Sequence, residues 1–170
     1  MNRVLAINTD AGLVLRNPSR ADGAAIWRLV SETGALEQNT AYTYLLLCTH
    51  FGDTCLVAEQ HGRLDGCVLA YQPPREPDCL FVWQIGVAPG ARGRGFASQL
   101  LDSLLYLPAC RHVRFVTATV TPGNTASRAL FAGFARRHGV ALVEQPFLDA
   151  ACFPATHPDE PLLKIGPLLA

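Results

Sequence analysis

The residues best suited to chemistry are two arginines set among three glycines, in the stretch Gly90-Ala91-Arg92-Gly93-Arg94-Gly95. Glycine lets the backbone approach a ligand closely and adopt positive φ, and arginine supplies cations suited to phosphate oxygens. Residues 96–107 follow with the apolar spacing of a helix, whose first N–H groups would face the same point. The stretch therefore predicts a binding site for a pyrophosphate group.

The two familiar nucleotide motifs fit this stretch poorly. It contains no G-x-G-x-x-G followed by a carboxylate for a ribose, and no G-K-[ST] of a P-loop. A glycine-rich turn before a helix is also a common connection in proteins that bind nothing there. The turn alone leaves a binding site and an ordinary connection equally open.

The segments around the turn alternate between strand-like and helix-like patterns. A glycine turn at Gly62 predicts a hairpin, while Gly34 and Gly139 mark the ends of two helices. Mixed hairpins and crossovers favour an α/β fold with one mixed sheet in a single domain over residues 1–170. We predict strands at 13–16, 54–59, 64–72, 80–87, 113–120, 140–143 and 162–165, the last as an edge strand, and helices at 21–33, 41–50, 96–107 and 124–137.

Two further segments have an expected role outside this framework. Residues 1–12 are expected to form a flexible N-terminus without the apolar core of a signal peptide. The proline-rich segment 147–161 is a candidate substrate lid, because long structureless loops are uncommon unless they are functional.

Composition excludes several classes of protein. The chain has 170 residues, 49 % of them hydrophobic, and a net charge of zero, so it lacks the basic excess of a nucleic-acid binder. No apolar run approaches the length of a membrane span, and the expected compartment is the cytoplasm. The six cysteines include no C-x-x-C pair and mostly sit in apolar stretches, which predicts small core residues, with no metal site.

A fuller pattern around the turn resembles the GCN5-related N-acetyltransferase family. Val87-Ala88-Pro89 precedes Arg92-x-x-Gly95-x-Ala97, and residues 121–135 are similar to the second motif of that family. The resemblance implies its mixed, mostly antiparallel sheet flanked by helices, and acetyl-CoA as co-substrate. The implied cofactor-binding residues are Ile85 and Val87 for the pantetheine arm, Arg92, Gly93, Arg94, Gly95 and Ala97 for the pyrophosphate, and Asn124, Ser127 and Arg128 from the second motif.

Longer segments resemble one branch of that family, the diaminobutyrate acetyltransferases of ectoine biosynthesis. They are residues 36–48, 80–89, 120–131 and 157–162. The resemblance implies acetylation of the side-chain N4 amine of L-2,4-diaminobutyrate by a homodimer, with Phe81 or Leu148 at an interface.

The same resemblance singles out substrate residues whose chemistry fits a diamino acid. The substrate has two ammonium groups and one carboxylate, and the implied contacts are Glu37, Tyr42, Trp83, His157 and Glu160. Trp83 could stack on an ammonium as a cation–π wall. The family commonly has aspartate where Glu37 stands. Each residue also has a plainer interpretation: Trp83 as core, Glu37 and Glu160 as solvated charges, and His157 as surface.

The reaction requires that the amine lose a proton before it attacks the thioester. A primary amine with a pKa of about 10.4 pays roughly 4–5 kcal/mol for this at neutral pH, so a base or a water wire must accept the proton. Many family members have a carboxylate where Trp83 and Gln84 stand, and this chain has none there. Glu160, His157 and Glu37 remain as candidate bases.

The thiolate that leaves also needs a partner. The family's frequent acid is a tyrosine in the second motif, which is Phe131 here and cannot donate a proton. Either Tyr42 or water donates the proton, or the thiolate leaves unprotonated. A backbone N–H near Val87 is expected to stabilise the oxyanion. Rival functions are acetylation of another small amine or of a protein N-terminus, and a non-catalytic acyl-CoA sensor.

Overall fold

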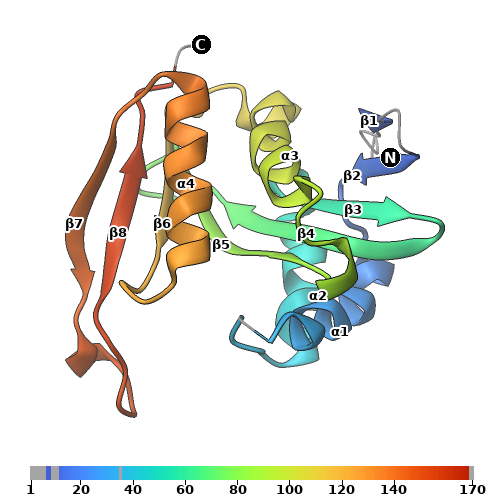
Figure 1. Ribbon diagram of the computed structural model, residues 1–170, viewed down its shortest axis with the longest axis horizontal. Coiled ribbons are helices and arrows are strands. Elements are labelled where there is room, and N and C mark those ends of the chain that lie inside the picture. Colours follow the sequence, from blue (N-terminus) through green and yellow to red (C-terminus); the bar gives the residue numbers. More distant parts are fainter. Residues whose placement is uncertain (1–6, 9–11, 35, 169–170) are drawn as a thin grey trace. The chain divides into compact units, whose positions relative to one another are not determined.

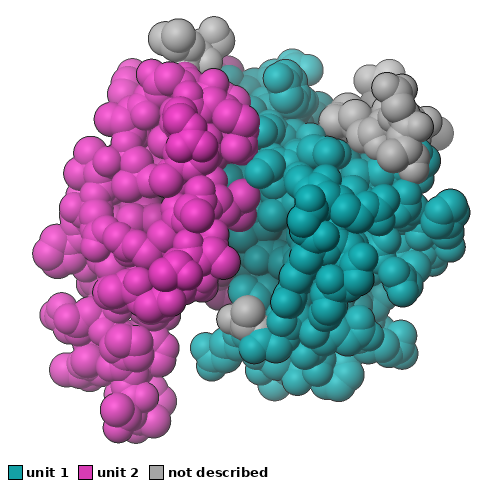
Figure 2. Space-filling view, viewed as in Figure 1, with its two compact units in different colours: residues 1–71, 84–111 teal, residues 72–83, 112–170 magenta. Residues whose placement is uncertain are grey.

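The computed structural model describes residues 7–8, 12–34 and 36–168 (Figure 1). Most of the N-terminus predicted to be flexible, residues 1–12, lies outside these described residues. The chain forms two compact units, one of residues 1–71 and 84–111 and the other of residues 72–83 and 112–170 (Figure 2). Strand β5, Cys79–Val87, contributes residues to both units.

The first unit contains an antiparallel set of strands in the order β1-β2-β3-β4. Their bounds are β1 Ile7–Asn8, β2 Leu13–Arg16, β3 Leu56–Gln60 and β4 Arg63–Tyr71. The two-residue turn between β3 and β4 has φ of 52° at His61 and 74° at Gly62, the geometry of a tight hairpin. The hairpin predicted from Gly62 is therefore confirmed.

Helices cover both faces of these strands. Helices α1, Gly23–Thr33, and α2, Ala41–His50, lie on one face, and α3, Phe96–Ser103, lies on the other (Figure 1). Two glycines, Gly66 on β4 and Gly86 on the neighbouring segment of β5, lie where these helices pack closely on the strands. A Cβ on Gly66 would lie 3.0 Å from Leu100 of α3, whereas a Cβ on Gly86 would lie 3.1 Å from Thr33 of α1.

Both ends of α1 have clear causes. The predicted helix 21–33 begins with a 3-10 turn at Arg20–Asp22, and its end is confirmed at Gly34, whose φ is 64°. Arg16 of β2 holds this beginning by pairing with Asp22 and with Glu59, at 2.8 Å each. The hydrogen bond from Arg16 lowers the pKa of Asp22 to about 2.

Helix α3 is shorter than the predicted helix 96–107. It ends at Ser103, and the chain continues as a 3-10 turn over Leu104–Tyr106. Pro108 explains why the helical conformation does not reach Leu107, since helical backbone angles are disfavoured before proline and Leu107 is extended with ψ of 138°.

The second unit has strands in the order β5-β6-β8-β7. They are the first residues of β5, then β6 Phe115–Thr119, β8 Glu160–Ile165 and β7 Leu142–Leu148. Strand β6 runs parallel to β5, and the other pairs are antiparallel. Helix α4, Thr125–His138, buries Phe131 and Phe134 and ends at Gly139 in the left-handed conformation, as predicted. The predicted fold class, mixed and mostly antiparallel strands flanked by helices, is confirmed.

The prediction that residues 162–165 form an edge strand is wrong. Strand β8 pairs with β6 on one side and with β7 on the other, and its Leu163 and Ile165 are buried. The edge strand is β7, which is largely exposed and contains Pro146, a residue without an N–H for a further partner.

The candidate lid is shorter than its predicted span of 147–161. Strand β7 continues through Leu148 and β8 begins at Glu160, with a 3-10 turn at Ala150–Cys152 between them. The irregular part is therefore residues 149–159. Its role as a lid stays a prediction.

Five of the six cysteines are buried, as expected of core residues, and Cys152 is exposed; all six are free thiols. Burial raises the pKa of the Cys55, Cys67 and Cys110 thiols to about 12, so these groups stay protonated. Within residues 7–8, 12–34 and 36–168, no helix is long and apolar enough to cross a membrane.

Candidate functional site

The glycine-rich turn opens directly into helix α3. Gly93 and Gly95 have φ of 75° and 79°, a left-handed conformation that a residue with a Cβ adopts only with strain. Gly95 is the N-cap of α3, and no side chain caps the N–H groups that begin the helix. A Cβ placed on Gly90 or Gly93 would have no neighbour within 4 Å. The turn therefore offers unshielded backbone donors to an anion.

The two arginines of the turn point to different partners. Arg92 donates from Nη2 to the backbone oxygen of Thr33 at 2.5 Å, at the last residue of α1. A cation at this end of a helix is favourable, because the last carbonyl groups carry partial negative charge. Arg94 is exposed and lies over the ring of Phe96, 4.6 Å from its centroid. The predicted pyrophosphate contacts of both side chains stay predictions.

The end of strand β5 adjoins the turn. Ile85 and Val87 are half-buried, and the N–H of Ala88 donates to the backbone oxygen of Asp65 at 2.8 Å. Side chains of a strand alternate between its faces, so Ile85 and Val87 share one face and Gly86 lies on the other. Because Gly86 has no side chain, the loop after α1 packs directly on the strand.

That loop, residues 36–40, is fastened by a chain of hydrogen bonds. The Gln84 amide donates from Nε2 to the backbone oxygen of Glu37 at 2.7 Å. Its Oε1 accepts from the Tyr44 hydroxyl at 3.2 Å, and the same hydroxyl accepts from the Asn39 N–H at 3.3 Å. Tyr44 is 0 % exposed and Gln84 is 7 % exposed. The Glu37 side chain itself is exposed.

Neither Gln84 nor Tyr44 was predicted as a site residue. A signal was present, because Gln84 is a lone amide inside the apolar run 80–87 and must find partners if it is buried. Tyr42, which was predicted to contact the substrate, is 67 % exposed near the start of α2 in the same unit.

In the second unit, the predicted site residues His157 and Glu160 lie close together. His157 Nδ1 is 2.7 Å from the backbone oxygen of Pro158, and a carbonyl oxygen only accepts, so Nδ1 carries the proton. The other ring nitrogen, Nε2, is 3.6 Å from Glu160 Oε1. Phe153 stacks on the imidazole with ring centroids 3.8 Å apart. The pair can take up a proton at Nε2 and stabilise the resulting charge with the carboxylate.

The predicted residues of the second motif have structural partners in this unit. Asn124 is the N-cap of α4 and accepts from the Ser127 N–H at 3.1 Å. Arg128 pairs with Glu144 on β7. Phe131, where the family often has tyrosine, is 2 % exposed. Whether Asn124, Ser127 and Arg128 also contact a cofactor stays a prediction.

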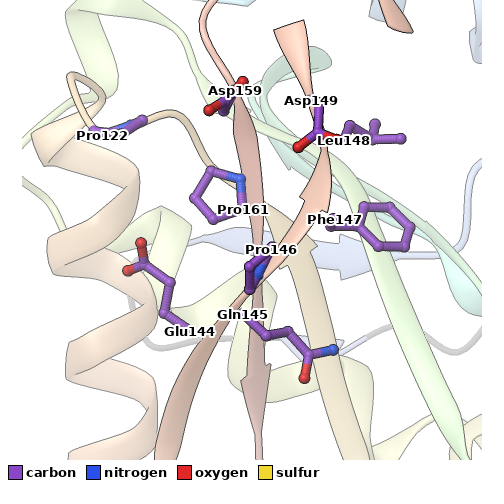
Figure 3. Close-up of a pocket in the computed structure, with 9 residues that line it drawn as sticks. All are labelled: Pro122, Glu144, Gln145, Pro146, Phe147, Leu148, Asp149, Asp159 and Pro161. Carbon is purple, nitrogen blue, oxygen red and sulfur yellow. The ribbon is translucent and has the colours of Figure 1, made fainter. Parts of the chain in front are cut away.

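A pocket of about 370 Å³ lies along β7 and the start of β8 in the second unit (Figure 3). Figure 3 shows Glu144 and Phe147 projecting to opposite sides of the strand. Asp159, another lining residue, accepts from the Ala150 N–H at 2.7 Å. None of the lining residues was predicted as a site residue, although five lie within the predicted lid 147–161: Phe147, Leu148, Asp149, Asp159 and Pro161. The residues that the structure describes include no group of three or more histidines, cysteines and carboxylates placed to hold a metal ion.

The structure groups the predicted residues by unit. The first unit contains Ile85, Val87, Arg92, Gly93, Arg94, Gly95, Ala97, Glu37 and Tyr42, and the second contains Trp83, Asn124, Ser127, Arg128, His157 and Glu160. Within the first unit, Arg92 connects the glycine-rich turn to the end of α1. Within the second, His157 and Glu160 form one pair.

Residues 24–134 match the acetyltransferase (GNAT) family. The chain is 52 % identical to the L-2,4-diaminobutyric acid acetyltransferase of Bordetella parapertussis over 90 % of this chain and 83 % of that relative. It is 43 % identical to the enzyme of the same name from Nocardia farcinica, over 91 % of this chain and 80 % of that relative.

Solved structures of acetyltransferases are also similar to this chain. The diaminobutyrate acetyltransferase of Paenibacillus lautus, in complex with its substrate L-2,4-diaminobutyric acid and coenzyme A, superposes with a TM-score of 0.89 at 42 % identity, over 93 % of this chain and 96 % of that one. The ribosomal-protein-S18-alanine N-acetyltransferase of Escherichia coli has a TM-score of 0.66 at 16 % identity, over 93 % of this chain and 96 % of that one. That second likeness concerns the fold alone.

Proposed function

The chain belongs to the acetyltransferase (GNAT) family and, within it, to the L-2,4-diaminobutyric acid acetyltransferases, and from this premise we propose its reaction. It transfers the acetyl group of acetyl-CoA to the side-chain N4 amine of L-2,4-diaminobutyrate, giving the N4-acetyl product of ectoine biosynthesis. The observation that carries the proposal is the TM-score of 0.89 and 42 % identity with a relative solved with this diamino acid and coenzyme A.

Acetyl-CoA is held at the glycine-rich turn. The pyrophosphate accepts hydrogen bonds from the N–H groups that begin α3, which have no side-chain cap. Arg94, which is exposed, adds a cation beside these donors. The pantetheine arm follows the backbone of Ile85 and Val87, and the second-motif residues Asn124, Ser127 and Arg128 complete the cofactor site.

The diamino acid is bound by Glu37, Tyr42, Trp83, His157 and Glu160. Carboxylates and ring faces suit its two ammonium groups. The open side chain of Glu37 on a fixed backbone supports its role, because it can reach a ligand without moving the loop.

The proton of the attacking amine goes to the His157–Glu160 pair. The geometry of the pair supports this assignment, because His157 Nε2 lies 3.6 Å from Glu160 Oε1 while Nδ1 is engaged with the backbone oxygen of Pro158. The N4 nitrogen attacks the thioester carbon and the C–S bond breaks. The nitrogen releases its second proton to water, and Tyr42 or water protonates the thiolate. A backbone N–H near Val87 stabilises the oxyanion.

The working form is a homodimer in the cytoplasm. The exposed edge strand β7, with Val143 55 % and Phe147 52 % exposed, supports a subunit interface that includes the half-buried Leu148 or Phe81. Six free thiols support a reducing compartment. Light scattering coupled to size exclusion tests the dimer, and a monomeric mass at micromolar concentration would contradict it.

Thiol release from acetyl-CoA, measured with a panel of amines, tests the proposed function. L-2,4-diaminobutyrate is expected to give the highest kcat/KM, with ornithine and lysine far lower because their longer side chains misplace the amine. A higher kcat/KM with a different amine would keep the acetyltransferase and reject this substrate. Cofactor binding without turnover on any amine would instead favour the acyl-CoA sensor.

A further inference from the structure

Gln84 occupies the part of β5 where many family members have a carboxylate, and here it does different work. Its amide is buried, 7 % exposed, and both of its ends are engaged. The contacts run in one direction: the Asn39 N–H donates to the Tyr44 hydroxyl, which donates to Gln84 Oε1, while Gln84 Nε2 donates to the Glu37 carbonyl oxygen.

The polarity of this chain requires an amide at position 84. The Glu37 carbonyl oxygen can only accept, so Gln84 presents its Nε2 to Glu37 and its Oε1 to Tyr44. An amide oxygen also only accepts, so the Tyr44 hydroxyl donates its proton to Oε1 and accepts from the Asn39 N–H. A carboxylate at position 84 would serve Tyr44 but could not donate to Glu37. An aliphatic residue would serve neither and would leave buried polar groups unpaired.

The contacts of Gln84 hold backbone atoms of the loop, not its side chains. The loop is fixed at Glu37 and Asn39, and Leu36 packs on the backbone of Gly86 from the same side. The Glu37 side chain is thereby left free while its Cα is fixed. Catalytic and binding groups act best when their supports are rigid.

We infer that Gln84 is a positioning residue and not a proton-transfer group. Together with Tyr44, it fixes loop 36–40 so that Glu37 meets the diamino acid. This inference rests on the proposed function for its kinetic effect. Its structural half, that Gln84 orders the loop, does not depend on the identity of the amine.

The test compares Gln84→Leu and Gln84→Glu with the matched control Gln60→Leu. Gln60 is also a buried glutamine, 9 % exposed, at the end of β3 in the same unit. Both Gln84 variants are expected to raise KM for L-2,4-diaminobutyrate about tenfold, the effect of one lost buried hydrogen-bond pair. KM for acetyl-CoA is expected to stay within about twofold, while Gln60→Leu lowers thermal stability without changing either KM.

Amide hydrogen exchange, followed by mass spectrometry on the peptide that contains Asn39, gives the second readout. Exchange at Asn39 is expected to speed up in both Gln84 variants and not in Gln60→Leu. Tyr44→Phe provides the same test if a Gln84 variant fails to fold. The inference is overturned by unchanged exchange at Asn39, or by equal increases in both KM values. A wild-type protein inactive on L-2,4-diaminobutyrate would reject the proposed function, whereas faster exchange would still support the ordering role.

Discussion

The turn at residues 90–95 and the loop at residues 36–40 belong to the same unit, yet they are held in different ways. The turn depends on backbone conformation, with positive φ at Gly93 and Gly95 and no side chain that caps α3. The loop depends on side chains, because Gln84 and Tyr44 hold its backbone by hydrogen bonds at Glu37 and Asn39. Arg92 connects the turn to Thr33, the last residue of the helix that precedes the loop.

This difference matches the two ligands that the proposed reaction needs. A pyrophosphate can be bound by N–H groups alone, so the turn needs only glycine at two positions. A diamino acid is distinguished from other amines by a few placed side chains, so the loop that carries Glu37 needs a rigid support. Substitutions in the turn should therefore alter the affinity for acetyl-CoA, and substitutions of Gln84 or Tyr44 should alter the affinity for the diamine.

The largest expected effect comes from a residue in neither region. Glu160→Gln removes the carboxylate beside His157 Nε2, and kcat is expected to fall by about 10²-fold or more, the usual contribution of acid–base catalysis. Steady-state kinetics at pH 7 to 9 measures this fall. Asp149→Asn is the control, an exposed carboxylate near the same hairpin whose side chain makes no cap hydrogen bond. An unchanged kcat/KM in Glu160→Gln would remove the pair from the mechanism.

The next effect concerns the turn. In Gly95→Ala the added Cβ makes the φ of 79° costly by about 1–2 kcal/mol, and we expect KM for acetyl-CoA to rise about tenfold. KM for the diamine should change little. Gly62→Ala is the matched control, since Gly62 also has positive φ, 74°, in the β3–β4 hairpin. Equal effects of the two variants on acetyl-CoA would show that the turn acts only through stability.

A smaller effect sharpens the account of the loop. Tyr44→Phe removes one hydroxyl from the chain between Asn39 and Gln84, and KM for the diamine is expected to rise by about threefold to tenfold, as for one hydrogen bond. Tyr106→Phe, at a tyrosine that is 74 % exposed, provides the comparison. The account of the loop fails if the two substitutions have the same effect on diamine KM.

The smallest effect is on stability at acid pH and should spare both affinities. Arg16 lowers the pKa of Asp22 from 3.8 to about 2. The contribution of Asp22 to the free energy of unfolding is therefore present above pH 4 and is lost as the pH falls toward 2. The pair is partly exposed to solvent, so we expect about 1 kcal/mol. Thermal unfolding of wild type and Asp22→Asn between pH 5 and 2 should converge at the acid end. A constant difference across this range would contradict the assignment.

Local signals in the sequence predicted the ends of several elements. Gly34 and Gly62 in the first unit and Gly139 in the second each mark such an end, because a left-handed backbone at these points suits glycine. The turn at 90–95 was predicted for the same reason. Such features depend on neighbouring residues only, which is why the sequence reveals them.

Features set by long-range pairing were missed. Strand β8 was predicted at the edge of the sheet because its short run of apolar residues does not reveal that β7 pairs beside it. The direction of Arg92 toward Thr33 joins residues far apart in the chain, and no local pattern encodes it. Gln84 was noted for the carboxylate it lacks, because its partners Glu37 and Tyr44 are known only once the fold is.

The position of the acetyl group on the product tests the central claim most directly. Wild-type protein would be incubated with acetyl-CoA and L-2,4-diaminobutyrate, and heteronuclear NMR would correlate the acetyl carbonyl with the protons of the carbon that bears the modified nitrogen. The account predicts a correlation to the side-chain CH₂ at position 4, as in N4-acetyl-L-2,4-diaminobutyrate. A correlation to the α-proton, or no acetylated product, would contradict it.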